Sequence, residues 1–198
     1  TLTPDGGYDL HLTEVESGYL VEVGSEAGQE LLDEYAQAGA MKDAQQGKLE
    51  QVRSDKQGRF ETRLHFDSTE LPALLGEAFD HPVWQDMGER CLACGSCTNV
   101  CPTCYCFNVE DEVNMTLTEG ERVRSWDSCQ LDEFASVAGG ENFREARSAR
   151  QRHRLMRKGK YLYEKFDELG CVGCGRCIRT CTAKISIVES YNAIYDGK

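Results

Sequence analysis

Ten of the eleven cysteines in this chain are gathered in two short runs, and closely spaced thiols are typical of a metal site. The first run holds six cysteines between Cys91 and Cys106, and the second holds four between Cys171 and Cys181. Cys129 stands alone between the runs. A disulfide framework predicts an even number of spread-out cysteines in a secreted chain, so these tight runs and the odd count favour metal ligation.

Both runs contain the spacing C-x-x-C-x-x-C-x-x-x-C, so they form an internal repeat. This is the spacing of bacterial two-cluster ferredoxins, in which three thiolates bind one [4Fe–4S] cluster and the fourth thiolate binds the other cluster. The repeat therefore predicts two [4Fe–4S] clusters that exchange one ligand. The expected ligands are Cys91, Cys94, Cys97 and Cys181 for cluster 1, and Cys171, Cys174, Cys177 and Cys101 for cluster 2.

Zinc is the main alternative metal for these cysteines. A zinc site uses four ligands, usually as two separated pairs, and does not need a third cysteine in each run. The repeated spacing therefore favours iron–sulfur clusters. One departure is Thr182, which follows Cys181 where the ferredoxin pattern has proline, and it leaves the turn there less fixed. Glycines between the ligands let the backbone wrap close to a cluster and point N–H groups at sulfur.

Three cysteines, Cys104, Cys106 and Cys129, lie outside both ligand sets. One interpretation is that they are small buried core residues. The other is that they lie close to cluster 1, where one replaces a ligand or where they bind a further metal centre. Asp127, two residues before Cys129, could then supply a ligand that is not a thiolate. The residues alone leave both interpretations open.

The elements that position the cysteines are expected to be short. We predict an α+β chain in which a small acidic αβ segment at 1–80 precedes a ferredoxin-like two-cluster domain at 81–198. A helical and hairpin insertion at 107–170 separates the two cysteine motifs. Within 1–80 the pattern predicts two strands around Gly18 and a helix at about 26–39. Two strands do not make a stable sheet alone, which indicates a longer N-terminal domain or a partner subunit.

Between the cysteine runs we expect a hairpin that turns at 119–121, a short helix from Asp127 or Ser128, and a long basic helix at 143–160. That helix carries eight Lys or Arg residues and one acid, Glu145. The whole chain has a net charge of −12, so this concentration of positive charge is unusual here. The helix presents either an ordinary solvated face or a cationic face placed against negatively charged clusters or a partner.

Composition and missing motifs exclude several function classes. The net charge of −12 argues against a general nucleic-acid-binding role. No run of 18 apolar residues is present, so no membrane span is expected. No dinucleotide fingerprint, Walker loop or Ser/His/Asp set is evident, so we expect no catalytic residue in this chain. Exposed thiols and iron–sulfur ligation favour a reducing, anaerobic cytoplasm.

The first cysteine run, CLACGSCTNVCPTCYCF from Cys91 to Phe107, resembles two related proteins. These are the β subunit of cytoplasmic nickel–iron sulfhydrogenases and the iron–sulfur electron-transfer subunit of anaerobic sulfite reductase. The segments WDSC at 126–129, AGGENFR at 138–144 and GCVGCGRC at 170–177 are similar in order and spacing, as is GYLVEVG at 18–24. The resemblance covers about 18–185 and includes Cys104, Cys106 and Cys129. Members of this family are longer at the N-terminus, which implies that this chain is shortened there.

The resemblance implies an electron-transfer iron–sulfur subunit of a soluble, anaerobic, multisubunit oxidoreductase. Such a subunit would relay single electrons between a flavin subunit that handles NAD(P)H and a catalytic metal subunit of hydrogenase or sulfite reductase type. The alternative is a catalytic iron–sulfur protein of the disulfide-reductase type that uses the extra cysteines. Cys104 and Cys106 have C-x-C spacing, whereas thiol–disulfide chemistry usually uses C-x-x-C.

Overall fold

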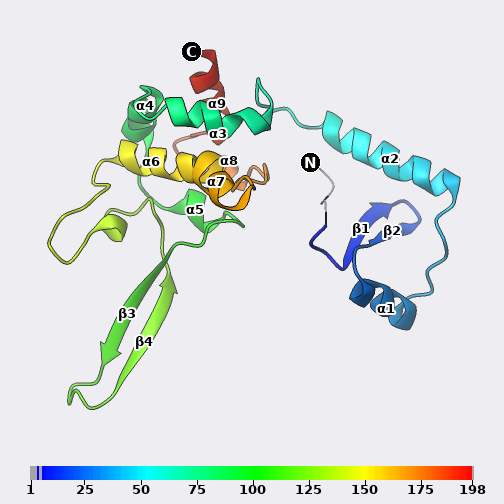
Figure 1. The fold of residues 1–198 in the computed structure, drawn as a ribbon, viewed down its shortest axis with the longest axis horizontal. Coiled ribbons are helices and arrows are strands. Elements are labelled where there is room, and N and C mark those ends of the chain that lie inside the picture. Colours follow the sequence, from blue (N-terminus) through cyan, green and yellow to red (C-terminus); the bar gives the residue numbers. More distant parts are fainter. Residues whose placement is uncertain (1–3, 5, 198) are drawn as a thin grey trace. The chain divides into compact units, whose positions relative to one another are not determined.

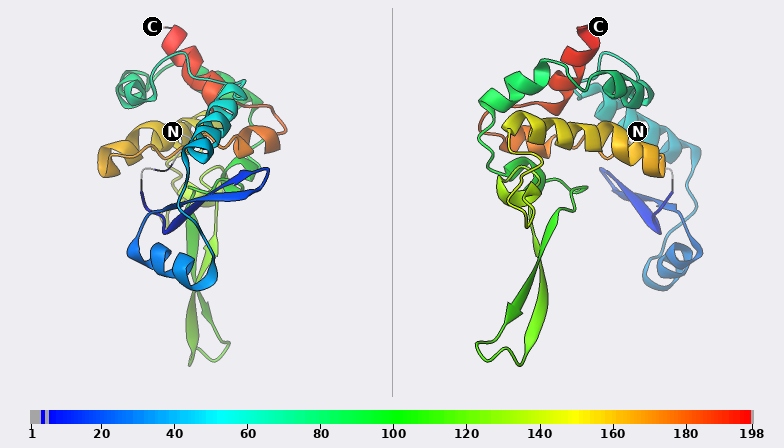
Figure 2. Two further views of the ribbon diagram at one scale, coloured as in Figure 1. Left: turned by 90° about the vertical axis from the view of Figure 1, so that its right-hand side faces the viewer. Right: turned by 60° about the vertical axis from the view of Figure 1, so that its left-hand side comes forward.

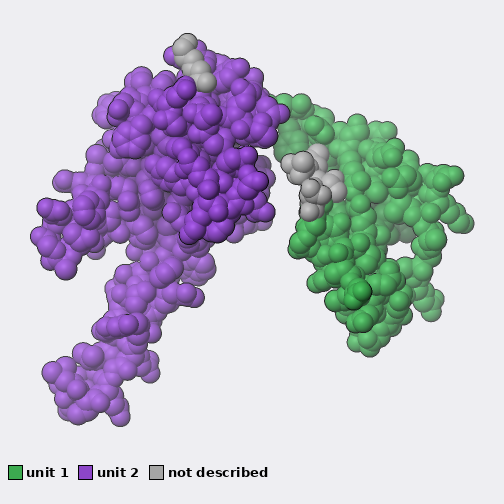
Figure 3. Space-filling view, viewed as in Figure 1, with its two compact units in different colours: residues 1–63 green, residues 64–198 purple. Residues whose placement is uncertain are grey.

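The structure, a computed structural model, describes residue 4 and residues 6–197 (Figure 1). The chain divides into two compact units between residues 63 and 64 (Figure 3). We expected the division near residue 80. The helix α3 (Leu71–Glu77) lies between residue 64 and the expected boundary at residue 80. Its leucines are buried in the core of the second unit. The division therefore falls before this helix.

The first unit contains the predicted hairpin and helix. Strands β1 (Leu10–Val15) and β2 (Gly18–Val23) pair antiparallel, followed by helices α1 (Glu26–Tyr35) and α2 (Asp43–Gly58). Ser25 caps α1, because its Oγ accepts a hydrogen bond from Gly28 N at 3.1 Å. Arg53 connects α2 to β2 by donating to both carboxylate oxygens of Glu22 at 2.7 and 2.8 Å. The longer N-terminal domain stays a prediction.

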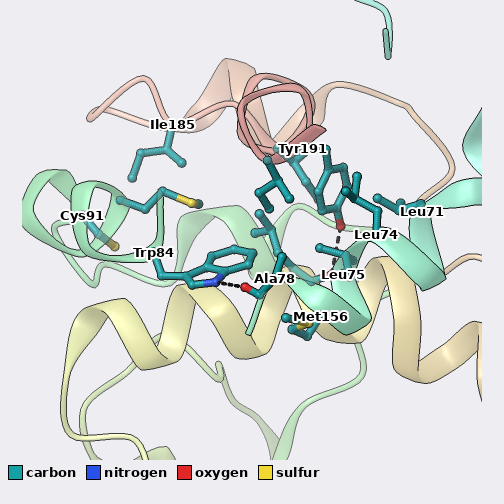
Figure 4. Close-up of a cluster of buried hydrophobic side chains, with 13 residues drawn as sticks. Leu71, Leu74, Leu75, Ala78, Trp84, Cys91, Met156, Ile185 and Tyr191 are labelled. Carbon is teal, nitrogen blue, oxygen red and sulfur yellow. Dashed lines mark hydrogen bonds between the residues drawn. The ribbon is translucent and has the colours of Figure 1, made fainter. Parts of the chain in front are cut away.

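The core of the second unit is helical (Figure 4). The buried side chains come mainly from α3, α4 (Val83–Arg90), α6 (Arg147–Met156) and α9 (Ile187–Asp196). Two buried polar groups bond to backbone carbonyls: Trp84 Nε1 donates to Ala78 O at 2.7 Å, and Tyr191 Oη donates to Leu155 O at 2.9 Å. Cys91 belongs to this core, so the first cysteine run begins directly on it.

The basic helix predicted at 143–160 begins later and extends further. It consists of α6, a π-helical turn η3 (Arg157–Tyr161) and α7 (Leu162–Phe166) in succession. Gly159 lies in the π-helical turn, and a Cβ atom there would be 2.5 Å from Leu75 Cδ1. The close approach of α3 therefore requires glycine at this position. Helix α3 itself follows the short turn η1 (Ser68–Glu70). Single π turns are frequent at functional sites.

The hairpin between the cysteine runs is formed by β3 (Phe107–Val113) and β4 (Gly120–Trp126). Its connecting residues are 114–119, so the turn predicted at 119–121 is wrong by a few residues. The hairpin extends away from the helices of its unit (Figure 2). After it, the expected helix from Asp127 or Ser128 is reduced to a short 3-10 turn, η2 (Glu133–Ala135).

Each cysteine run contains a single short helix, α5 (Ser96–Asn99) in the first and α8 (Arg176–Thr180) in the second. In the described residues the strands form two separate two-stranded sheets, β1–β2 and β3–β4. The mixture of helices and strands agrees with the predicted α+β class. The specific ferredoxin-like arrangement stays a prediction.

Candidate metal centre

The two cysteine runs follow the same backbone path. Gly95 and Gly175 occupy equivalent positions with φ of 73° and 70°, and each precedes the short helix of its run. Two residues earlier, Ala93 and Gly173 also match, with φ of 53° and 68°. A left-handed alanine is uncommon because its Cβ crowds the backbone. The internal repeat read from the sequence is therefore a structural repeat, and it bends both loops around their cysteines.

The turn after the fourth cysteine is also the same in both runs. Cys104 N donates to Cys101 O at 3.3 Å, and Lys184 N donates to Cys181 O at 3.0 Å. Thr182 stands inside the second of these turns. The threonine therefore leaves the turn formed, and the expectation of a less fixed turn finds no support in these hydrogen bonds.

The four cysteines predicted for cluster 1 line one cavity. Its empty volume is about 430 Å³, which includes space open to solvent. Cys91, Cys94 and Cys97 come from the first run, and Cys181 reaches the same cavity from the second. Cys181 therefore shares a cavity with three cysteines of the first run. The ligand assignment itself stays a prediction.

The thiols of this cavity do not form a site for a single metal ion. Tetrahedral zinc would hold its thiolates within about 4 Å of one another, because each Zn–S bond is about 2.3 Å. Among the described residues, no three His, Cys, Asp or Glu side chains converge closely enough to bind a single ion. The cavity therefore presents four thiols without forming a single-ion site.

The sulfurs of this cavity accept hydrogen bonds from the chain. Gln151 Nε2 donates to Cys91 Sγ at 2.9 Å, and Ala93 N donates to the same sulfur at 3.3 Å. Ile185 N donates to Cys181 Sγ at 3.4 Å. Hydrogen bonds to ligand sulfur stabilise its negative charge and are one means by which a protein sets the potential of an iron–sulfur cluster.

The cysteines predicted for cluster 2 are connected through Thr103. Its Oγ1 donates to Gly170 O at 2.7 Å, which ties the end of the first run to the start of the second. Burial raises the pKa of Cys171, and negative charge on Cys177 and Cys101 raises it further. These three thiols therefore lie close together. Cys174 is exposed, and the described contacts do not place it against them.

One face of the basic helix is buried. Arg150, Arg154 and Lys158 follow one another at four-residue intervals, which places them on the same side of the helix, and each is no more than 5% exposed. Arg150 forms an ion pair with Asp132. In the described part of the chain, no carboxylate forms an ion pair with Arg154 or Lys158. The interpretation of this helix as a solvated face is therefore wrong for this side.

Arg154 lies between the two cysteine runs and lines the cavity of cluster 1. Burial lowers its pKa, but negative charge on Cys97 and Cys177 outweighs burial and raises the pKa above the ordinary arginine value. Its Nε atom has no hydrogen-bond partner among the described atoms. Because an unpaired buried charge is costly, a guanidinium here requires an anion, and a thiolate-bound cluster supplies one.

A family model of the 4Fe–4S dicluster domain matches residues 90–185. The matched residues include both cysteine runs, the hairpin and the basic helix.

The chain is also similar to sulfhydrogenase 2 subunit beta of Pyrococcus furiosus. The two are 36% identical over 195 residues, which cover 96% of this chain and 56% of that protein. This chain thus spans little more than half the length of that relative. The resemblance to sulfhydrogenase β subunits predicted from the sequence is confirmed. No solved structure matches the chain.

Sequence reasoning missed several residues of the dicluster domain. Gln151 contacts a ligand cysteine and Thr103 connects the runs, yet neither belongs to the cysteine motif. Lys158 is one of the eight basic residues of the predicted helix, but the sequence does not reveal its contact with Thr103. None of the described helices is long and apolar enough to span a membrane.

Proposed function

We propose that this chain is the electron-transfer subunit of a hydrogenase-like or sulfite-reductase-like complex. Cys91, Cys94, Cys97 and Cys181 would hold one [4Fe–4S] cluster, and Cys171, Cys174, Cys177 and Cys101 the other. Such a cluster, when bound, supplies transfer of one electron at a time. The observation that carries the proposal is the shared cavity of Cys181 and the three cysteines of the first run.

In this proposal, the side chains around the two sites stabilise the reduced state of the clusters. Arg154 places a buried positive charge beside cysteines of both sites, which favours the more negative reduced state. Gln151 does the same for one site through its hydrogen bond to Cys91 Sγ. The core packed against Cys171, Cys177 and Cys181 reduces their contact with water, which strengthens both interactions.

The expected partners are a subunit with flavin that handles NAD(P)H and a subunit with the catalytic metal. Support comes from the relative, whose name describes it as one subunit of a sulfhydrogenase. The cytoplasmic location and the ferredoxin-like arrangement of the dicluster domain belong to the same proposal. The disulfide-reductase alternative would use Cys104 and Cys106 as one redox pair. It receives no added support, because the Cys104 thiol contacts Cys101 and the Cys106 thiol contacts Cys129 instead.

The test uses the full chain purified without oxygen. We expect dithionite to reduce its clusters, while NAD(P)H alone leaves them oxidised until a flavin subunit is added. Absorbance and EPR during a titration report both results. Oxidation of NAD(P)H by the chain alone, or steady turnover of a small disulfide substrate, would overturn the relay and favour a catalytic role.

A further inference from the structure

The base of the β3–β4 hairpin brings together the cysteines that the two cluster motifs do not use. Cys106 directly precedes β3, and Asp127 directly follows β4. The strand register pairs Phe107 with Trp126, and Asp127 N donates to Cys106 O at 3.0 Å. Antiparallel pairing therefore places the segment with Asp127 and Cys129 beside Cys106, although about twenty residues separate them in sequence.

The thiols at this base are in contact. The Cys129 thiol donates a hydrogen bond to Cys106 Sγ, and Cys104 lies within electrostatic reach of Cys129. Cys129 is buried, while Cys104 and Cys106 are partly buried. The three thiols thus form one group, and a thiol of this group also contacts Cys101, through the hydrogen bond between Cys101 and Cys104.

A pocket opens onto this group. Its empty volume, which includes space open to solvent, is about 910 Å³, and its lining includes Cys104, Cys106 and Asp127 together with Cys101 and Trp126. The pocket is separate from the cavity of cluster 1, with which it shares no lining residue. Besides the Cys101 thiol, it therefore offers the thiols of Cys104 and Cys106 and a carboxylate to a bound group, and the Cys129 thiol contacts Cys106.

A buried positive charge adjoins the pocket. Lys158 is 4% exposed and lies within electrostatic reach of Cys101, Cys104 and Cys106. Its Nζ donates to Thr103 Oγ1 at 2.5 Å, which is a neutral partner. Because a buried ammonium is stable only beside negative charge, Lys158 favours an anionic group at this place.

We propose that Cys104, Cys106, Cys129 and Asp127 hold a third iron–sulfur cluster, of the [4Fe–4S] type with one carboxylate ligand. This goes beyond the proposed function, which requires two clusters. A single zinc ion fits less well, because these neighbouring side chains are not arranged as a site for one metal ion among the described residues. Through Cys101 the third cluster would lie beside cluster 2, with Lys158 between the two ligand sets.

The first measurement is iron and acid-labile sulfide on the full chain purified without oxygen. At four irons per cluster, the proposal expects about twelve irons per chain, whereas the two motif clusters alone give about eight. Values near eight overturn the proposal, whether the three thiols are then found free or joined as a Cys106–Cys129 disulfide. One bound zinc ion in addition to about eight irons overturns it as well.

Two variants test the ligands. Cys129→Ala is expected to lose about one third of the iron, as one cluster of three. Asp127→Asn keeps the backbone hydrogen bond to Cys106 and is expected to lose one iron, giving the EPR signal of an oxidised [3Fe–4S] cluster. Ser125→Ala, on β4, is the control and should keep the wild-type iron content. Full iron content and an unchanged EPR spectrum in both test variants would overturn the ligand set.

The Asp127 variant covers the case in which Cys129→Ala fails to fold. It leaves all eleven cysteines in place, so a change confined to about one iron identifies the third site. The result is also separate from the relay, since electron transfer through the two motif clusters would persist in Asp127→Asn even where the third cluster is damaged.

Discussion

Gln151 Nε2 donates a hydrogen bond to Cys91 Sγ over 2.9 Å, and both residues are buried. The cysteine ends α4, whereas the glutamine lies on α6, 60 residues later. The contact therefore depends on the packing of the two helices. It also connects the hydrophobic core directly to the first cysteine run of the dicluster domain.

Replacement of this amide tests its effect on one cluster. Gln151→Leu keeps the side-chain size and removes the donor, so the potential of cluster 1 should fall because its reduced, more negative state loses a hydrogen bond. We expect a decrease of about 40 mV, equivalent to about 1 kcal/mol. EPR-monitored redox titration measures it. Cluster 2 is the internal control, and an equal shift in both clusters would argue against a local hydrogen bond.

Arg154 should affect both clusters, because it adjoins cysteines of both sites. Arg154→Gln removes a buried positive charge, which destabilises the reduced states and lowers both potentials by on the order of 50–100 mV. Arg152→Gln is the matched control, because this arginine lies on the same helix, on the face where it stacks on Phe79. Unchanged potentials in Arg154→Gln would show that the guanidinium does not act on the clusters.

The exchange of the fourth cysteine can be tested by iron content in double variants. Cys97→Ala and Cys181→Ala are assigned to one cluster, so combining them should cost no more iron than either alone, about four atoms. Combining Cys97→Ala with Cys101→Ala should remove about eight, because each residue belongs to a different cluster. The reverse pattern would place Cys101 in cluster 1 and contradict the assignment.

Gly159 is expected to control the stability of the second unit. In Gly159→Ala the new methyl group would press on Leu75 and Leu71, which are fully buried. Overpacking of this kind costs about 1–3 kcal/mol of unfolding free energy. Denaturant unfolding of the iron-loaded chain, compared with wild type, measures the change.

The control for this experiment is Gly139→Ala, since a Cβ atom at Gly139 meets nothing within 4 Å. We expect it to stay within about 0.5 kcal/mol of wild type. Equal stability of the two alanine variants would mean that α3 and η3 can separate at little cost, contrary to the close contact described here.

The segment after the hairpin shows why local patterns were insufficient. We expected a helix from Asp127 or Ser128, because both are good capping residues. Instead, Ser128 Oγ accepts from Gln130 N at 3.1 Å and shares a hydrogen bond with Thr98 Oγ1 at 2.7 Å. Gln130 Nε2 donates to Arg150 O at 3.0 Å. These distant partners hold the segment in an irregular conformation that propensity alone does not reveal.

The basic helix shows a similar limit. Its positive charge was evident from sequence, and two interpretations remained open. Periodicity places Arg150, Arg154 and Lys158 on one face, but it does not say whether that face meets water or protein. Burial of that face against the cysteine runs decides the question, because an unpaired cation is stable there only beside negative charge.

The sequence by itself determined which metal chemistry to expect of this protein. Thiols at fixed short spacings can wrap only a small set of metal groups, and the repeated run specifies the 4Fe–4S dicluster domain without knowledge of the fold. Tertiary structure decided what surrounds those thiols. The donor on Cys91, the cation between the runs and the grouping of Cys104, Cys106 and Cys129 all join residues distant in sequence, and only packing and strand register bring them together.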